Sequence, residues 1–291
     1  MPPAAQLLIT GALFATGGAA LKSCVELTPI TAACARTGLA AIVLFAVQWS
    51  RVRRPSRGAL LIALAHATTM LLFALANRET TAARAIFLQS TAPLWLLVLS
   101  PLLVREPVRR HELAPAGLVA LGLVLLVVGF PAPIESAPNP ALGDLLGATC
   151  GVTWALTVLG MRSLARDQDS AVVAPAYGCL FATILGAPFA DWEAFGHAET
   201  QTLGLVLWLG VFQIAIPYLL LGRALARVQA FEATLLLMIE PALSPLFAWL
   251  VHGESVTPLT AVGAAAILGA SVWRARCQQP VSEAEPADRS P

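Results

Sequence analysis

Two stretches of the sequence, 91-TAPLWLLVLSPLLVRE-106 and 239-IEPALSPLFAWLVHGE-254, decide the fold. Each is an apolar run with a proline at its third position and a glutamate at its last, Glu106 or Glu254. The two prolines, like the two glutamates, are 148 residues apart, and each run leads into a segment rich in Gly and Ala. The repetition of this pattern indicates that the chain consists of two related halves.

Apolar runs of similar length recur along the whole chain. Of the 291 residues, 57% are hydrophobic and only 12% are charged, and the mean hydropathy is +0.75. A soluble domain carries roughly 25% charged residues. A helix that crosses a bilayer needs about 20 apolar residues, and ten such runs predict an all-α integral membrane protein with ten transmembrane helices. The expected spans cover residues 5–21, 29–49, 59–76, 82–103, 113–130, 142–161, 171–190, 202–221, 230–251 and 256–273.

The two halves are expected to insert into the membrane in opposite directions, because each contains an odd number of helices. We therefore expect two inverted five-helix repeats, residues 1–131 and 132–275, around a central cavity. Such repeats are known among transporters that bind their substrate near the bilayer midplane. Residues 276–291 form a polar tail with Pro and acidic residues, which we expect to be disordered and cytoplasmic.

Basic residues indicate the orientation, because Lys and Arg favour cytoplasmic loops. With these ten spans, successive connections lie on alternate sides of the membrane. The connections and flanking residues on one side hold thirteen basic residues, and those on the other side hold only Lys22 and Arg78. This asymmetry places both termini in the cytoplasm. In a bacterial cell the protein would lie in the inner membrane.

Several landmarks resemble a known family, the EamA-type proteins of the drug/metabolite transporter superfamily. In the second half they are Gly143-Asp144-Leu145-Leu146, Trp154-Ala155, Arg162, the segment from Tyr218 to Ala224-Leu225, Glu240-Pro241 and Gly253-Glu254; in the first half they are Arg36, Pro93 and Glu106. The resemblance implies a cavity lined mainly by helices 1 to 4 and 6 to 9, with helices 5 and 10 at the periphery. It also implies export of amino acids or other metabolites, and one branch of the family exports aromatic amino acids.

Two ionisable residues lie deep in the expected spans. Arg36 lies toward the middle of the second span and Glu240 in the middle of the ninth. An ionisable group at this depth costs roughly 2.5–3.5 kcal/mol on insertion scales, so it should face protein or water. Substrate contact, a mutual ion pair and bonds to carbonyls freed at a helix break are the three open interpretations. Arg84 and Glu232 lie near an interface, which their side chains can reach.

Other polar and aromatic residues within the spans are candidates for the same cavity. Polar groups at bilayer depth need partners, which either neighbouring helices or a substrate can provide. Trp154 lies inside the sixth span rather than at an interface, where it could form an aromatic wall. The candidate substrate-binding residues are Arg36, His66, Gln89, Trp154, Tyr177, Gln213 and Glu240.

Further residues are given structural roles. Glu106 and Glu254 lie at helix ends just before the next span, where a carboxylate can accept hydrogen bonds from free N–H groups. Pro93, Pro217 and Pro241 interrupt helical hydrogen bonding and could kink their helices around a cavity. The five cysteines show no spacing suited to a metal, so we expect no metal site and no cofactor.

Composition and motifs narrow the function class. The net charge of +1 argues against nucleic acid as a partner. The absence of a GxxxxGK[ST] motif argues against ATP hydrolysis, and the absence of HExxH and GxSxG motifs argues against an enzyme. The favoured hypothesis is a secondary transporter that exports small amphipathic metabolites, above all hydrophobic or aromatic amino acids, by alternating access. The alternatives are a membrane-embedded enzyme, a scaffold, and a transporter of another metabolite.

Overall fold

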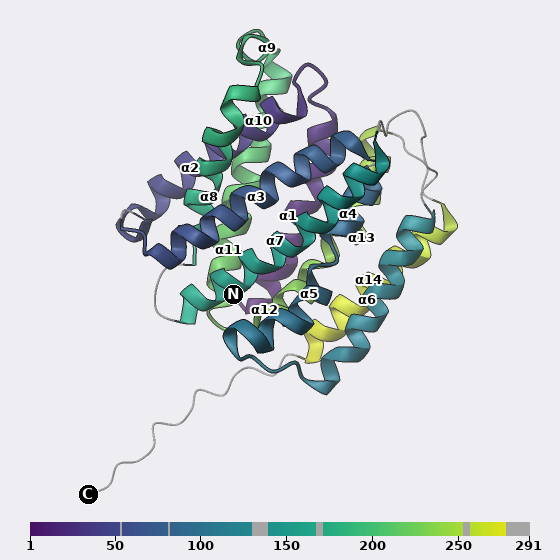
Figure 1. Ribbon diagram of the computed structural model, residues 1–291. Coiled ribbons are helices and arrows are strands. Elements are labelled where there is room, and N and C mark those ends of the chain that lie inside the picture. Colours follow the sequence, from purple (N-terminus) through teal and green to yellow (C-terminus); the bar gives the residue numbers. More distant parts are fainter. Residues whose placement is uncertain (53, 81, 130–138, 167–170, 253–256, 278–291) are drawn as a thin grey trace, which may run out of the picture.

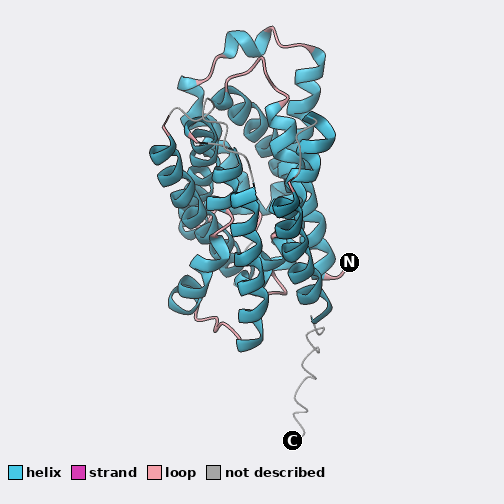
Figure 2. Ribbon diagram, turned by 90° about the vertical axis from the view of Figure 1, so that its right-hand side faces the viewer, coloured by secondary structure: helices cyan, strands magenta, loops and turns pink. Residues whose placement is uncertain are grey.

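The structure is a computed structural model, and it describes all residues except 53, 81, 130–138, 167–170, 253–256 and 278–291. Every regular element within these residues is a helix (Figures 1 and 2). The expected tail and Glu254 lie outside the described residues, apart from Arg276 and Cys277, which end the last helix.

The helices of each half follow one another with short connections. Those of the first half are α1 (Pro3–Lys22), α2 (Pro29–Val52), α3 (Arg57–Glu79), α4 (Ala82–Gln89), α5 (Ala92–Leu99), the π-helical segment η1 (Ser100–Val104) and α6 (Arg110–Gly129). Those of the second half are α7 (Pro140–Arg166), α8 (Val173–Gly186), the 3₁₀ segment η3 (Ala187–Phe189), α9 (Trp192–Gly196), α10 (Thr200–Gly210), the π-helical segment η4 (Val211–Ala215), α11 (Ile216–Leu225), α12 (Ala230–Leu237), α13 (Ile239–His252) and α14 (Pro258–Cys277).

Many of these helices are long and apolar enough to cross a bilayer. Within the described residues, seven helical stretches meet that criterion, and three shorter apolar helices accompany them: Glu112–Leu126, Val173–Phe189 and Pro258–Trp273. Exposed Leu, Val, Ile and Trp side chains cover much of the outer surface, which is the arrangement expected of a surface that faces lipid. The chain is an all-helical integral membrane protein.

Three of the expected spans are interrupted rather than continuous. Pro93 is the second residue of α5, Pro217 the second residue of α11, and Pro241 the third residue of α13. Proline has no N–H, so it is tolerated where a helix begins and breaks the hydrogen-bond ladder elsewhere. Each proline therefore lies in the first turn of a new helical segment, immediately after a break or a π-helical segment.

The connection after α8 contains a helix that the sequence pattern did not predict. The short helix α9 begins after Asp191, whose carboxylate accepts a hydrogen bond from the Ala194 N–H at 2.9 Å. The expected seventh span, residues 171–190, is an α-helix only as far as Gly186 and continues as η3. Pro188, which cannot supply a helical N–H, lies in that tighter turn.

Helices α6 and α14 pack against each other at one side of the bundle (Figure 1). A Cβ atom on Gly122 would lie 2.8 Å from the Gly263 carbonyl oxygen, and a Cβ atom on Gly263 would lie 2.7 Å from the Gly122 carbonyl oxygen. The two backbones can approach this closely only because both residues are glycine. The Thr257 hydroxyl also donates to the Gly129 carbonyl at 2.9 Å.

Candidate functional site

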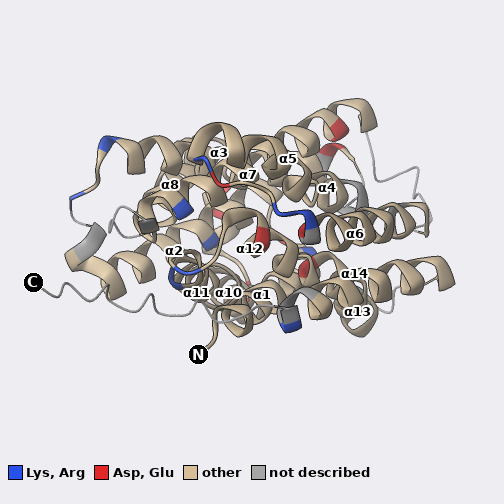
Figure 3. Cartoon of the chain, turned by 90° about the horizontal axis from the view of Figure 1, so that it is seen from below, with Lys and Arg blue, Asp and Glu red and all other residues tan. Residues whose placement is uncertain are grey.

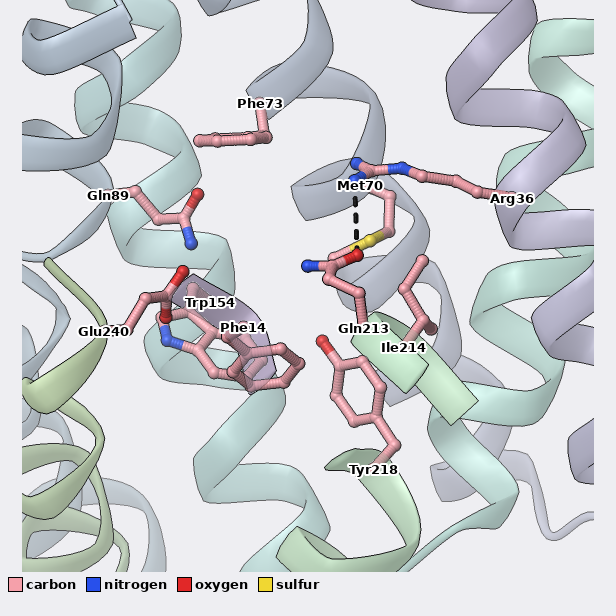
Figure 4. A pocket seen from close by; sticks show the side chains of 10 residues that line it. All are labelled: Phe14, Arg36, Met70, Phe73, Gln89, Trp154, Gln213, Ile214, Tyr218 and Glu240. Atoms are coloured by element: carbon pink, nitrogen blue, oxygen red, sulfur yellow. Dashed lines mark hydrogen bonds between the residues drawn. The ribbon is translucent and has the colours of Figure 1, made fainter. Parts of the chain in front are cut away.

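A cavity lies between helices of both halves (Figure 4). The empty space between its lining side chains, including the part that is open to solvent, is about 450 Å³. Helices α6 and α14 contribute none of the lining residues, and neither does α8. The side chains that line the cavity are Phe14, Arg36, Met70, Phe73, Gln89, Trp154, Gln213, Ile214, Tyr218 and Glu240.

Arg36, from α2, carries the positive charge of the cavity. Its side chain is buried, and its Nη1 donates to the Gln213 Oε1 at 3.4 Å. Its Nε is buried and has no hydrogen-bond partner among the residues that the structure describes. A buried guanidinium with only a neutral amide as partner is costly to maintain, because the lost hydration is not replaced. This arrangement leaves donors available for an anionic ligand.

Glu240, from α13, faces Arg36 across the cavity beside Gln89 (Figure 4). Among the residues that the structure describes, its carboxylate forms no ion pair and accepts no hydrogen bond; only its backbone carbonyl is used, by the Ser244 hydroxyl. Arg36 and Glu240 therefore do not neutralise each other, which removes the mutual ion pair from the interpretations of these two charges. The cavity thus has a guanidinium on one side and a carboxyl group on the opposite side.

An aromatic cluster forms the floor between the two charged sides (Figure 4). The rings of Phe14, Trp154 and Tyr218 meet edge to face, with centroids 5.5–6.2 Å apart. Edge-to-face pairs of this kind are favourable beyond their apolar burial and hold one another in place. The floor is therefore a rigid apolar surface from three helices, α1, α7 and α11.

Five of the seven residues predicted to bind substrate line this cavity: Arg36, Gln89, Trp154, Gln213 and Glu240. His66 does not line it; its buried ring packs edge to face behind Tyr218 at 4.7 Å, and its Nε2 lies 3.6 Å from the Cys179 Sγ. Tyr177 does not line it either, and packs instead against Phe45 and Phe181. Tyr218, rather than Tyr177, is the tyrosine that lines the cavity.

Sequence reasoning missed half of the lining residues: Phe14, Met70, Phe73, Ile214 and Tyr218. Four of them are ordinary apolar residues in apolar helices, and nothing in their type distinguishes them from lipid-facing neighbours. Tyr218 could have been found, because it belongs to the segment that resembles the EamA-type landmarks and a tyrosine hydroxyl at bilayer depth needs a partner.

Glu106 lies outside the cavity, where it links the two halves. Its Oε1 accepts from the Arg162 Nε at 2.8 Å, and its Oε2 accepts from the Ala230 N–H at the start of α12 at 3.4 Å. Arg162 also donates through Nη1 to the Leu225 carbonyl at 2.6 Å. The expected contact of Glu106 with a helix N-terminus is therefore made with α12, whereas Glu112 accepts from the Arg109 N–H at the start of α6.

These contacts bring together the ends of η1, α7 and α11 and the start of α12. The segments on either side of them carry Arg105, Arg109, Arg110, Arg223 and Arg227, so several basic residues gather at one end of the bundle (Figure 3). Within the described residues, no group of three or more His, Cys, Asp or Glu side chains is arranged to hold a metal ion.

Comparison with known families gives two matches to one family within this chain. The EamA-like transporter family matches residues 2–128 and again residues 141–273.

Individual relatives are more distant. The threonine/homoserine exporter RhtA of Escherichia coli strain K12 is 28% identical over 204 residues, which cover 69% of this chain and 65% of the exporter, so the match spans slightly less than two thirds of that protein. An uncharacterized transporter of Archaeoglobus fulgidus is 27% identical over 229 residues, which cover 77% of this chain and 78% of that protein. A crystal structure with 20% sequence identity superposes with a TM-score of 0.75 over 93% of this chain and 96% of the other, which shows the same fold.

Proposed function

The chain belongs to the EamA-like transporter family and is a transporter rather than an enzyme, and from this premise we propose that it exports amino acids, above all hydrophobic or aromatic ones, by alternating access. The observation that carries the proposal is the placement of Arg36 and Glu240, which form no ion pair within the described residues, on opposite sides of one cavity. The similarity to an exporter named for threonine and homoserine supports the same substrate class.

A free amino acid has the chemistry that the cavity requires. Its carboxylate can accept from the Arg36 guanidinium, whose planar donors suit carboxylates, and its ammonium can approach the Glu240 carboxylate. Its side chain then lies on the floor formed by Phe14, Trp154 and Tyr218. A zwitterion bound in this way supplies both ionisable side chains with partners of opposite charge, so its binding is favoured in a site of low dielectric constant.

The proposed mechanism uses two inverted five-helix repeats, residues 1–131 and 132–275. The substrate binds between the repeats, and movement of one repeat against the other opens the cavity alternately to each side. The breaks at Pro93, Pro217 and Pro241 fit this mechanism, because interrupted helices can bend where a continuous helix cannot. No cofactor takes part, and the partners are the small-molecule substrate and the lipid of the bacterial inner membrane.

A screen of labelled amino acids tests the proposal. Purified protein in liposomes, with and without a pH gradient, is expected to accelerate the passage of at least one hydrophobic or aromatic amino acid, or of threonine, well above the rate of protein-free liposomes. Nucleosides and sugars in the same assay serve as controls for leakage. Transport of these controls without transport of any amino acid would contradict the proposed substrate class.

The orientation is tested by reporter fusions. We predict cytoplasmic termini and an external connection between the halves, because thirteen basic residues lie on one side. A periplasm-active reporter should be inactive when fused after Trp273 and active when fused after Asn139. The reverse result would overturn the orientation, and equal activity at both positions would overturn the opposite insertion of the halves.

A further inference from the structure

Gly17 of α1 lies directly against the side chain of Gln213. A Cβ atom on Gly17 would lie 2.7 Å from the Nε2 and 2.9 Å from the Cδ of Gln213, closer than real contacts come, and 3.1 Å from its Cγ, so the Gln213 amide would have to move. Gly17 is buried and lies one helical turn after Phe14, so it faces the side of the cavity. The Gln213 amide therefore occupies the space that any side chain at position 17 would fill.

Gln213 in turn holds the guanidinium of Arg36. It lies in the middle of η4, a π-helical segment, and such segments are frequent at functional sites because they redirect side chains. Its Oε1 accepts from the Arg36 Nη1, and this is the hydrogen bond that the Arg36 side chain makes within the described part of the chain. The position of the guanidinium thus depends on the position of the Gln213 amide.

We propose that Gly17 sets the geometry of the binding site: because it has no side chain, the Gln213 amide can lie against it and orient Arg36 toward the carboxylate of the substrate. The identity of the ligand rests on the proposed function. The positioning of Gln213 and Arg36 rests on the contacts of Gly17, Gln213 and Arg36. Gly17 is a positioning residue, because it acts on the ligand only through the other two.

Gly17→Ala tests the proposal, and Gly18→Ala is its matched control. Both changes add one methyl group to neighbouring positions of α1 and raise helix propensity equally, but a Cβ atom on Gly18 meets only the Ile86 Cδ1, at 3.9 Å. With labelled threonine and phenylalanine as probes in liposomes, Gly17→Ala should raise KM roughly ten- to hundredfold, as expected for a lost hydrogen bond to a charged group. kcat should stay within about twofold, and Gly18→Ala should change neither value.

The double variant Gly17→Ala/Gln213→Ala separates positioning from simple crowding. Once Gln213 is truncated, Gly17→Ala has no amide to displace, so the double variant should match Gln213→Ala in KM within about twofold. It should also fold if Gly17→Ala alone does not. Without ligand, Gly17→Ala should have a lower melting temperature than Gly18→Ala in protein that keeps Gln213. In protein that carries Gln213→Ala, the two changes should give the same melting temperature.

Two outcomes overturn the inference. One is a Gly17→Ala protein whose KM and melting temperature equal those of Gly18→Ala; the other is additivity of the Gly17 and Gln213 changes. If wild-type protein transports neither probe, the proposed function fails for these substrates. The ligand-free melting temperatures still decide whether Gly17 seats Gln213, so the two failures are distinguishable.

Discussion

Arg36→Gln should raise the KM for the transported amino acid roughly a hundredfold or more, because truncating one partner of a buried, hydrogen-bonded charge pair costs about 2–5 kcal/mol. The group lost here is the Arg36 guanidinium, which is proposed to bind the substrate carboxylate. The protein should fold as well as wild type, since Arg36 has no ionic partner in the described structure and its removal leaves no buried charge behind. Transport kinetics in liposomes and the melting temperature in detergent measure the two effects separately.

Three further variants serve as controls for this prediction. Arg36→Lys keeps the charge but loses the planar donors, so its KM should lie between those of wild type and Arg36→Gln. Glu240→Gln should weaken binding of the ammonium group, and Trp154→Ala should weaken binding of large side chains most. If Arg36→Gln, Glu240→Gln and Trp154→Ala all kept wild-type affinity and transport, the proposed site would be wrong. A fall in expression and melting temperature with unchanged KM would assign Arg36 a structural role.

Glu106→Gln is expected to destabilise the fold by about 3–5 kcal/mol, as does removal of one partner of a buried ion pair. The Arg162 guanidinium would keep its bond to the Leu225 carbonyl but lose its counter-charge, and the Ala230 N–H would lose a charged acceptor. Both side chains are mostly buried, with exposures of 14% for Arg162 and 8% for Glu106. Unfolding monitored in detergent measures the loss, and KM should change little because neither residue lines the cavity.

The double variant Glu106→Gln/Arg162→Met should recover part of this stability, since it also removes the guanidinium that Glu106→Gln leaves without its counter-charge. Glu193→Gln removes an exposed carboxylate of α9 and should have no effect. A Glu106→Gln protein as stable as wild type would contradict the assignment of this pair as a stabilising contact between the two halves.

The apolar runs predicted helical stretches well, because the length needed to cross hydrocarbon constrains them strongly. They could not predict how each helix is rotated. Tyr177 of α8 and Tyr218 of α11 both lie in apolar helices, yet of the two only Tyr218 lines the cavity. A helix that is apolar on all sides shows no periodicity that would distinguish an inward face from a lipid-facing one.

Charge was the more informative signal for the site. Arg36 and Glu240 could be selected because few ionisable residues lie deep in the spans, and both line the cavity. The partners of Glu106 could not be predicted, because Arg162 and Ala230 are 56 and 124 residues away in sequence. The seat of Gln213 on Gly17 depends on the π-helical segment η4, whose register is set by tertiary packing rather than by local sequence.

A competition assay in the same liposomes tests most directly whether the cavity recognises both the carboxylate and the ammonium of an amino acid. Transport of labelled phenylalanine or threonine by wild-type protein is measured in the presence of one of three unlabelled competitors. These are the same amino acid, its amide, which lacks the carboxylate, and its N-acetyl derivative, which lacks the ammonium. The account predicts that the parent amino acid competes at least roughly tenfold better than either derivative, as expected for one lost charge-assisted bond. Equal competition by all three compounds would contradict it.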